Sequence, residues 1–187
     1  MIRPFIAATL LMAGPALAES PLPFDVGGPY ALINHHGQPH TQVDPDGQPQ
    51  LLFFGYANCP AICSAAMPLM ADIADNLAGE GITIRPVMIT VDPARDTVEA
   101  MGPALAKIHD RFLGLTGDED ALAMAYAAFS VEHELAYVDI ADGPIYTHGS
   151  LIYLMDAEGE VLTLIPPVLD DHTATQIALK YLRPKAG

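Results

Sequence analysis

The chain has 187 residues, of which 51% are hydrophobic and 17% charged, a composition that excludes an intrinsically disordered protein and suits one domain with a sizeable core. Its formal net charge is −15, and so acidic a surface repels phosphate backbones and anionic lipid headgroups. We therefore expect no nucleic-acid partner, whereas a basic protein surface or a cation is a natural one.

Residues 1–18 have the pattern of an export signal. Arg3 provides a positive start, an apolar stretch follows, and a small-x-small cleavage site ends at Ala18. A glycine and a proline interrupt the apolar run, which is shorter than the roughly 20 residues that cross a bilayer. The sequence predicts a signal peptide at 1–18 and an exported, periplasmic domain at 19–187 that does not span the membrane after cleavage. An uncleaved membrane anchor is the alternative.

Apolar runs and turn residues predict alternating strands and helices. In chain order we expect a small hairpin over residues 30–33 and the region near 43, a strand at 51–56, a helix at 64–77, a strand at 82–91, a helix at 97–109 with Asp96 as its N-cap, a strand at 113–116, a helix capped by Asp118 and running to 129, strands at 151–155 and 161–165, and a helix from 170 or 171 to about 182. This alternation indicates parallel central strands with a late antiparallel hairpin. The predicted fold class is α/β, compatible with a thioredoxin-like fold, with a central mixed sheet flanked by helices and an N-terminal hairpin.

The two cysteines, Cys59 and Cys63, lie between the first buried strand and its helix. We expect Cys59 to be an N-cap with Pro60 at the first helical position, where unpaired N–H groups and the helix dipole favour thiolate over thiol. Four residues apart on one helical turn, both sulfur atoms face the same side. This spacing permits either a disulfide or a shared soft metal ion, and it differs from the two intervening residues of thioredoxin-type redox enzymes.

A third ligand is needed if the cysteines hold a metal. Two thiolates suit Cu(I), which then needs one more soft or borderline ligand, typically an imidazole. Structural zinc usually has four protein ligands. His148 precedes the strand expected at 151–155 and can supply that imidazole. By itself, however, a histidine in a loop is usually an ordinary surface residue.

Four motifs occur in a fixed order along the chain. They are Phe54-Gly55-Tyr56-Ala57-Asn58-Cys59-Pro60-Ala61-Ile62-Cys63, Thr90-Val91-Asp92-Pro93-Ala94-Arg95-Asp96-Thr97, Gly114-Leu115-Thr116-Gly117, and His148-Gly149-Ser150 followed by Ile152-Tyr153-Leu154-Met155-Asp156. Together they resemble the Sco/SenC family, over roughly residues 28–182. The resemblance implies a thioredoxin-like domain that binds copper through Cys59, Cys63 and His148 and helps to assemble the dinuclear copper centre of cytochrome c oxidase.

The chain departs from the family pattern at two positions. Ala61 stands where family members commonly have an acidic residue between the cysteines, and Gly149 stands where serine usually follows the ligand histidine. Many relatives are also membrane-anchored, whereas this chain is expected to be exported and cleaved. These departures leave the ligand set intact and bear on partner recognition.

Two functions follow from these residues. The first is a metallochaperone that takes copper, as Cu(I) with Cu(II) left open, from a copper donor protein and passes it to the copper-bearing subunit of cytochrome c oxidase or another acceptor. The second is a thiol-disulfide oxidoreductase in which Cys59 and Cys63 are a redox-active pair that reduces acceptor cysteines before metallation. The histidine motif favours the chaperone, because reductase chemistry has no need of His148.

Asp92, Arg95 and Asp96 follow the second core strand, at the end of the sheet where the cysteines are expected. They suit either support of the metal ligands and docking of a partner, or simple capping and a local ion pair.

Two further groups of side chains have plain explanations. The first consists of the methionines Met67, Met70, Met88, Met124 and Met155, which we expect to pack in the core rather than to bind copper. The second consists of His35, His36 and His40, for which a solvated loop is favoured over a second metal site or a role in receiving copper.

Overall fold

The computed structural model describes residues 22–57, 59 and 63–183. The predicted signal peptide and Ala61 lie outside the described residues, and so does the side chain of Cys63. No helix in the described part of the chain is long and apolar enough to cross a membrane.

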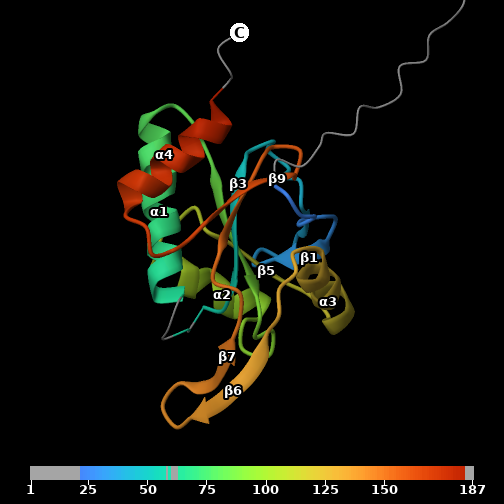
Figure 1. Cartoon of the computed structure of the whole chain (residues 1–187). Coiled ribbons are helices and arrows are strands. Elements are labelled where there is room, and N and C mark those ends of the chain that lie inside the picture. Colours follow the sequence, from blue (N-terminus) through green and yellow to red (C-terminus); the bar gives the residue numbers. More distant parts are fainter. Residues whose placement is uncertain (1–21, 58, 60–62, 184–187) are drawn as a thin grey trace, which may run out of the picture.

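A seven-stranded mixed sheet with the order β2-β1-β5-β4-β3-β8-β9 forms the centre of the molecule (Figure 1). Its strands are β1 (Ala31–Asn34), β2 (Pro39–Thr41), β3 (Gln50–Gly55), β4 (Arg85–Thr90), β5 (Leu113–Thr116), β8 (Ile152–Met155) and β9 (Val161–Ile165). β3, β4 and β5 are parallel, while β8 adds to β3 and β1 adds to β5 in the antiparallel sense. This arrangement confirms the predicted mixed sheet with its N-terminal hairpin.

Helices cover both sides of the sheet. They are α1 (Cys63–Gly79), α2 (Val98–Leu105), α3 (Glu119–Ala128) and α4 (Asp171–Leu182). The strands lie between α1 and α4 on one side and α3 on the other (Figure 1), and Asn76 of α1 donates a hydrogen bond to the Thr175 hydroxyl of α4 over 3.1 Å. Because both faces are covered, β3 is buried along its whole length, as its continuous apolar run predicts.

Asp118 caps α3 as predicted. The last helix was predicted to start at Asp170 or Asp171, and the Asp170 carboxylate caps α4, which begins at Asp171. The prediction that Asp96 caps the next helix is wrong: Thr97 is the N-cap of α2, and its side chain accepts a hydrogen bond from the N–H of Ala100. Asp96 is unavailable as a cap because its carboxylate is buried and bonded to other segments. The helix also ends at Leu105, four residues before the expected end.

The predicted core position of the methionines holds for four of the five. Met67, Met70, Met88 and Met155 are buried, whereas Met124 is 63% exposed. The prediction is wrong for Met124 because it lies on the side of α3 that faces solvent.

A second, two-stranded sheet was missing from the predicted elements. It is the antiparallel hairpin of β6 (Glu134–Asp139) and β7 (Gly143–Thr147), which projects away from the central sheet (Figure 1). The side chains of β6 are almost all exposed. Its sequence therefore lacks the alternation of apolar and polar residues that predicts a half-buried strand. His148 directly follows β7, so this hairpin determines where the histidine lies.

Candidate metal centre

The cysteine segment leaves the carboxyl end of the central strand β3. The N–H of Cys59 donates to the carbonyl oxygen of Tyr56 over 3.2 Å, and Cys59 packs, partly buried, against the core. α1 is described from Cys63 onward, so the expectation that Pro60 starts the helix lies outside the described residues. Cys59 and the backbone of Cys63 therefore occupy a strand-to-helix connection, the position where α/β sheets commonly bind ligands.

Asp96 fixes this segment to the neighbouring strand. Its carboxylate accepts hydrogen bonds from the N–H of Ala57, at 3.1 Å, and from the hydroxyl of Thr90, at 2.8 Å. Only 2% of Asp96 is exposed, and this burial raises the pKa of its carboxyl, an effect that the two hydrogen bonds oppose. The end of β4 thus holds the chain two residues before Cys59.

Arg95 links three segments around the candidate centre. Its guanidinium pairs with the buried carboxylate of Asp92 and lies over the ring of Tyr56, with 5.4 Å from its central carbon to the ring centroid. It also donates to the carbonyl oxygens of Asp142 and Pro144, each at 2.6 Å. Of the two roles expected for these residues, the local ion pair is present, and Arg95 in addition secures the turn end of the hairpin that leads to His148.

The hydrogen bond of His148 determines its tautomer. Nδ1 lies 2.9 Å from the carbonyl oxygen of Gly149. Because a carbonyl can only accept, Nδ1 carries the proton in the neutral ring and Nε2 carries the lone pair. This contact uses a backbone atom, so it does not depend on which side chain follows the histidine, and a Cβ built on Gly149 would come no closer than 4.0 Å to a neighbour, Val131.

Two aromatic rings position the imidazole at the cysteine end of the sheet. The ring of His148 meets the rings of Phe53 and Tyr56 edge to face, with centroid distances of 5.7 and 5.9 Å. Tyr56 stands three residues before Cys59 in the sequence. The structure therefore brings His148 and Cys59, 89 residues apart in number, to the same edge of the sheet.

Tyr56 and Tyr146 are the site residues that the sequence analysis missed. Their rings pack edge to face with centroids 5.8 Å apart, and Tyr56 also contacts Arg95 and His148. Tyr56 closes an apolar run and resembles a core residue in sequence, so only its position next to the cysteines gave a signal. Tyr146 lies in the unpredicted β7.

Among the described side chains, which do not include that of Cys63, no three or more of His, Cys, Asp or Glu are arranged to hold a metal ion. The ligand set expected from Cys59, Cys63 and His148 therefore rests on Cys59, the backbone position of Cys63 and the orientation of His148. The donors in question are sulfur and imidazole nitrogen, which suit soft metal ions.

The histidines of the N-terminal hairpin are organised differently from the expectation. His35 accepts a hydrogen bond at Nδ1 from the N–H of Gly114 over 3.0 Å, and its ring packs 4.0 Å from that of His36. The lone pair of Nδ1 is thus in use and Nε2 carries the proton, which argues against a metal ligand. His40 is buried, so the favoured interpretation as a solvated loop is wrong for that residue.

Comparison with known proteins agrees with this arrangement. A model of the SCO1/SenC family matches residues 18–183. The chain belongs to the SCO1/SenC family. The SCO2-like protein RC0895 of Rickettsia conorii is 36% identical over 139 residues, which cover 73% of this chain and 67% of that protein. The mitochondrial SCO2 homolog of Mus musculus is 35% identical over 134 residues, and this chain spans about half of it, 52%.

The fold of this SCO1/SenC protein is also that of solved relatives. The crystal structure of Arabidopsis thaliana ScoI with copper bound matches with a TM-score of 0.78 and 27% identity, covering 84% of this chain and 98% of the other. The predicted thioredoxin-like fold and the Sco/SenC resemblance are thereby confirmed.

Proposed function

We propose that this chain is a copper chaperone that binds Cu(I) through the thiolates of Cys59 and Cys63 and Nε2 of His148. The observation that carries the proposal is the hydrogen bond from Nδ1 of His148 to the Gly149 carbonyl, since it orients the ring and sets the tautomer in which Nε2 is the donor nitrogen. A ring that is packed between two aromatic side chains, next to the segment of Cys59, is already oriented before a metal arrives.

The chemistry of the donors supports copper as the cargo. Two thiolates and one imidazole make a soft donor set that suits Cu(I) and falls one ligand short of the usual structural zinc site. Copper is also present in the solved Arabidopsis thaliana relative, which shares the fold over most of both chains. We propose the same ion for this chain.

The acceptor that we propose is the copper-bearing subunit of cytochrome c oxidase, as the family resemblance implies. Copper would arrive from a donor protein and leave by ligand exchange with the acceptor. Both steps need Cys59 and Cys63 as thiolates, so oxidation of the pair to a disulfide would abolish binding.

We also propose that residues 1–18 are an export signal and that the functional chain lies in the periplasm. The family match begins at residue 18, which agrees with a domain that starts near the expected cleavage site. N-terminal sequencing of the protein recovered from periplasmic extracts would test this, with Glu19 as the expected first residue.

Anaerobic competition for Cu(I) between a calibrated chelator and the reduced chain of residues 19–187 tests the copper proposal. We expect one tightly bound Cu(I) in the wild type. His148→Ala and Cys63→Ser should weaken binding by more than the roughly 10–100-fold that loss of a residue supporting a ligand costs. His172→Ala, at an exposed position of α4, is the matched control and should bind as the wild type does.

Unchanged affinity in His148→Ala would contradict the three-ligand site. Turnover of a protein disulfide substrate that needs both cysteines and proceeds without His148 would then assign the chain to the alternative, a thiol-disulfide oxidoreductase.

A further inference from the structure

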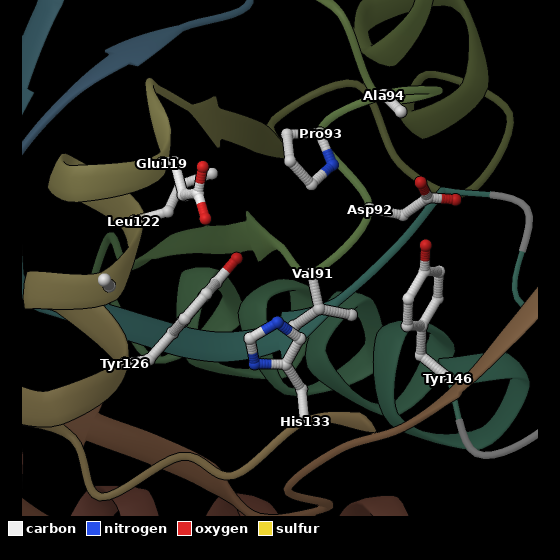
Figure 2. Close-up of a pocket in the computed structure, with 10 residues that line it drawn as sticks. Val91, Asp92, Pro93, Ala94, Glu119, Leu122, Tyr126, His133 and Tyr146 are labelled. Carbon is white, nitrogen blue, oxygen red and sulfur yellow. The ribbon is translucent and has the colours of Figure 1, made fainter. Parts of the chain in front are cut away.

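A pocket opens beside the candidate metal centre. It has a volume of about 420 Å³ and lies between α3, the chain that follows β4, and the base of the β6–β7 hairpin. Figure 2 shows Tyr126, His133 and Tyr146 around this pocket, with Val91 and Asp92 along another wall. The His133 ring packs 4.5 Å from that of Tyr126. The pocket is mostly apolar and is large enough for one aromatic or branched aliphatic side chain.

The pocket shares one residue with the surroundings of His148. Tyr146 lines the pocket and packs against Tyr56, whose ring in turn contacts His148. A side chain in the pocket would therefore lie two aromatic rings away from the proposed ligand. Whatever binds there is held close to the cysteine end of the sheet.

One face of the hairpin extends this apolar surface. Leu135 pairs with Tyr146 and Val138 pairs with Pro144. Directly paired residues of an antiparallel ladder point to the same side, and the bulge between Leu135 and Tyr137 keeps both apolar residues on the side of Tyr146. Leu135 is 56% exposed and Val138 66% exposed. A run of large apolar side chains exposed next to an apolar pocket is typical of a protein interface.

The charge around this surface is of one sign. Residues 119–147 contain six acidic side chains, Glu119, Asp120, Glu132, Glu134, Asp139 and Asp142, and no lysine or arginine. Arg95, which reaches the hairpin from outside this segment, is engaged by Asp92 and by two hairpin carbonyls. The acidic border repels a second copy of this chain, with its net charge of −15, and repels anionic lipid. It attracts a protein surface that carries lysine or arginine.

We propose that the pocket and the Leu135–Val138 face form a docking surface for a protein segment in which an apolar side chain is flanked by basic residues. The apolar side chain fills the pocket as a central anchor, while its basic neighbours face Glu119, which lines the pocket. The segment belongs to the protein that receives the copper, an assignment that rests on the proposed function. Binding of the segment itself does not require copper.

A peptide titration of the full chain tests this surface. The probe is a synthetic peptide, Lys-Lys-Gly-Phe-Gly-Lys-Lys, added to ¹⁵N-labelled protein and followed by NMR and calorimetry. We expect saturable shifts at Tyr126, His133, Leu135 and Tyr146. Ala123→Trp, which fills the pocket from α3, and Leu135→Asp should each weaken binding at least tenfold.

The controls separate the anchor from the charge. A peptide with alanine in place of phenylalanine, or with glutamate in place of lysine, should bind at least tenfold more weakly. Val168→Asp adds the same charge at an exposed apolar residue outside the pocket and should bind the peptide as the wild type does. Leu135→Asp should retain the wild-type affinity for Cu(I), so a failed docking surface and a failed copper site give different results.

Three results would overturn the docking proposal. The first is the absence of saturable shifts with the phenylalanine peptide, and the second is equal binding of the glutamate peptide. The third is a different occupant: dimerisation in sedimentation velocity, or binding to phosphatidylcholine–phosphatidylglycerol vesicles, that Leu135→Asp abolishes.

Discussion

The carboxylate of Asp96 accepts a hydrogen bond from the backbone N–H of Ala57, 39 positions earlier in the chain. The bond joins the segment after β4 to the segment that carries Cys59. Thr90 donates to the same carboxylate, so a single buried side chain couples two parallel strands at the edge where the metal ligands are expected. The conformation of the cysteine segment therefore depends on a residue of the second sequence motif.

Replacement of Asp96 by alanine should destabilise the fold and loosen the cysteine segment. The variant leaves the Ala57 N–H and the Thr90 hydroxyl without their acceptor, and an unsatisfied buried donor costs about 1–3 kcal/mol. Chemical denaturation should show a loss of that size, and amide exchange at Ala57 should accelerate. Unchanged exchange at Ala57 would mean that Asp96 does not hold this segment.

The titration of Asp96 gives a pH dependence of defined sign. Burial raises the pKa of this carboxyl above its ordinary value of 3.8, so the folded protein binds the proton more tightly than the unfolded chain does. The contribution of Asp96 to stability is complete below that ordinary value and is lost as pH rises through the raised pKa. The wild type should therefore gain stability relative to Asp96→Asn as pH is lowered from about 7 to 4. A constant difference across denaturation curves in this range would contradict the raised pKa.

Arg95 should not be replaceable by lysine. A guanidinium can pair with Asp92 while donating to both hairpin carbonyls, whereas an ammonium cannot reproduce this fork. We expect Arg95→Lys to destabilise the protein by about 1–3 kcal/mol and to accelerate amide exchange in β6 and β7. Lys180→Arg, at an exposed position of α4, is the control and should leave exchange in the hairpin unchanged.

His148 and His35 should show opposite tautomers. His148 faces a carbonyl at Nδ1 and should carry its proton there, whereas His35 accepts at Nδ1 and should carry its proton on Nε2. Long-range ¹H–¹⁵N spectra of the metal-free protein above pH 8 distinguish these forms. A proton on Nε2 of His148 would contradict the hydrogen bond on which the proposed copper site depends.

Ser130 follows the end of α3 and has a left-handed backbone conformation, with φ of 53°. It lines a shallow pocket together with His148. Glycine adopts this conformation without the strain that a Cβ introduces, so Ser130→Gly should stabilise the protein by up to about 1 kcal/mol. Ala127→Gly, at an exposed position inside α3, should instead destabilise it by about 1 kcal/mol. Thermal unfolding measures the melting temperature of each variant relative to the wild type. A lower melting temperature in Ser130→Gly would contradict the prediction.

The central fold was predictable because its signals are local. The continuous apolar run at β3 is typical of a strand that is buried on both faces. Asp118 and Asp170 cap their helices by accepting hydrogen bonds from the backbone N–H groups three residues later. β5 and β9 have the predicted bounds for the same reason.

What could not be predicted depends on contacts distant in sequence. Asp96 is of a residue type that commonly caps helices and stands just before α2. Its carboxylate instead accepts hydrogen bonds from Ala57 and Thr90, which lie outside that helix. β6 exposes Leu135 and Val138, so its pattern does not reveal a strand, and the position of His148 depends on that hairpin. The ligand candidates were found by motif, whereas the aromatic support from Tyr56 appeared only in the structure.

Copper K-edge absorption spectroscopy of the Cu(I)-loaded protein tests the proposed three-ligand copper site. We expect a first coordination shell of two sulfur atoms and one nitrogen atom, with the multiple-scattering signature of an imidazole that disappears in His148→Ala. His172→Ala should retain that signature. A shell without an imidazole in the wild type, or a wild-type spectrum in His148→Ala, would contradict a Cu(I) site made by Cys59, Cys63 and His148.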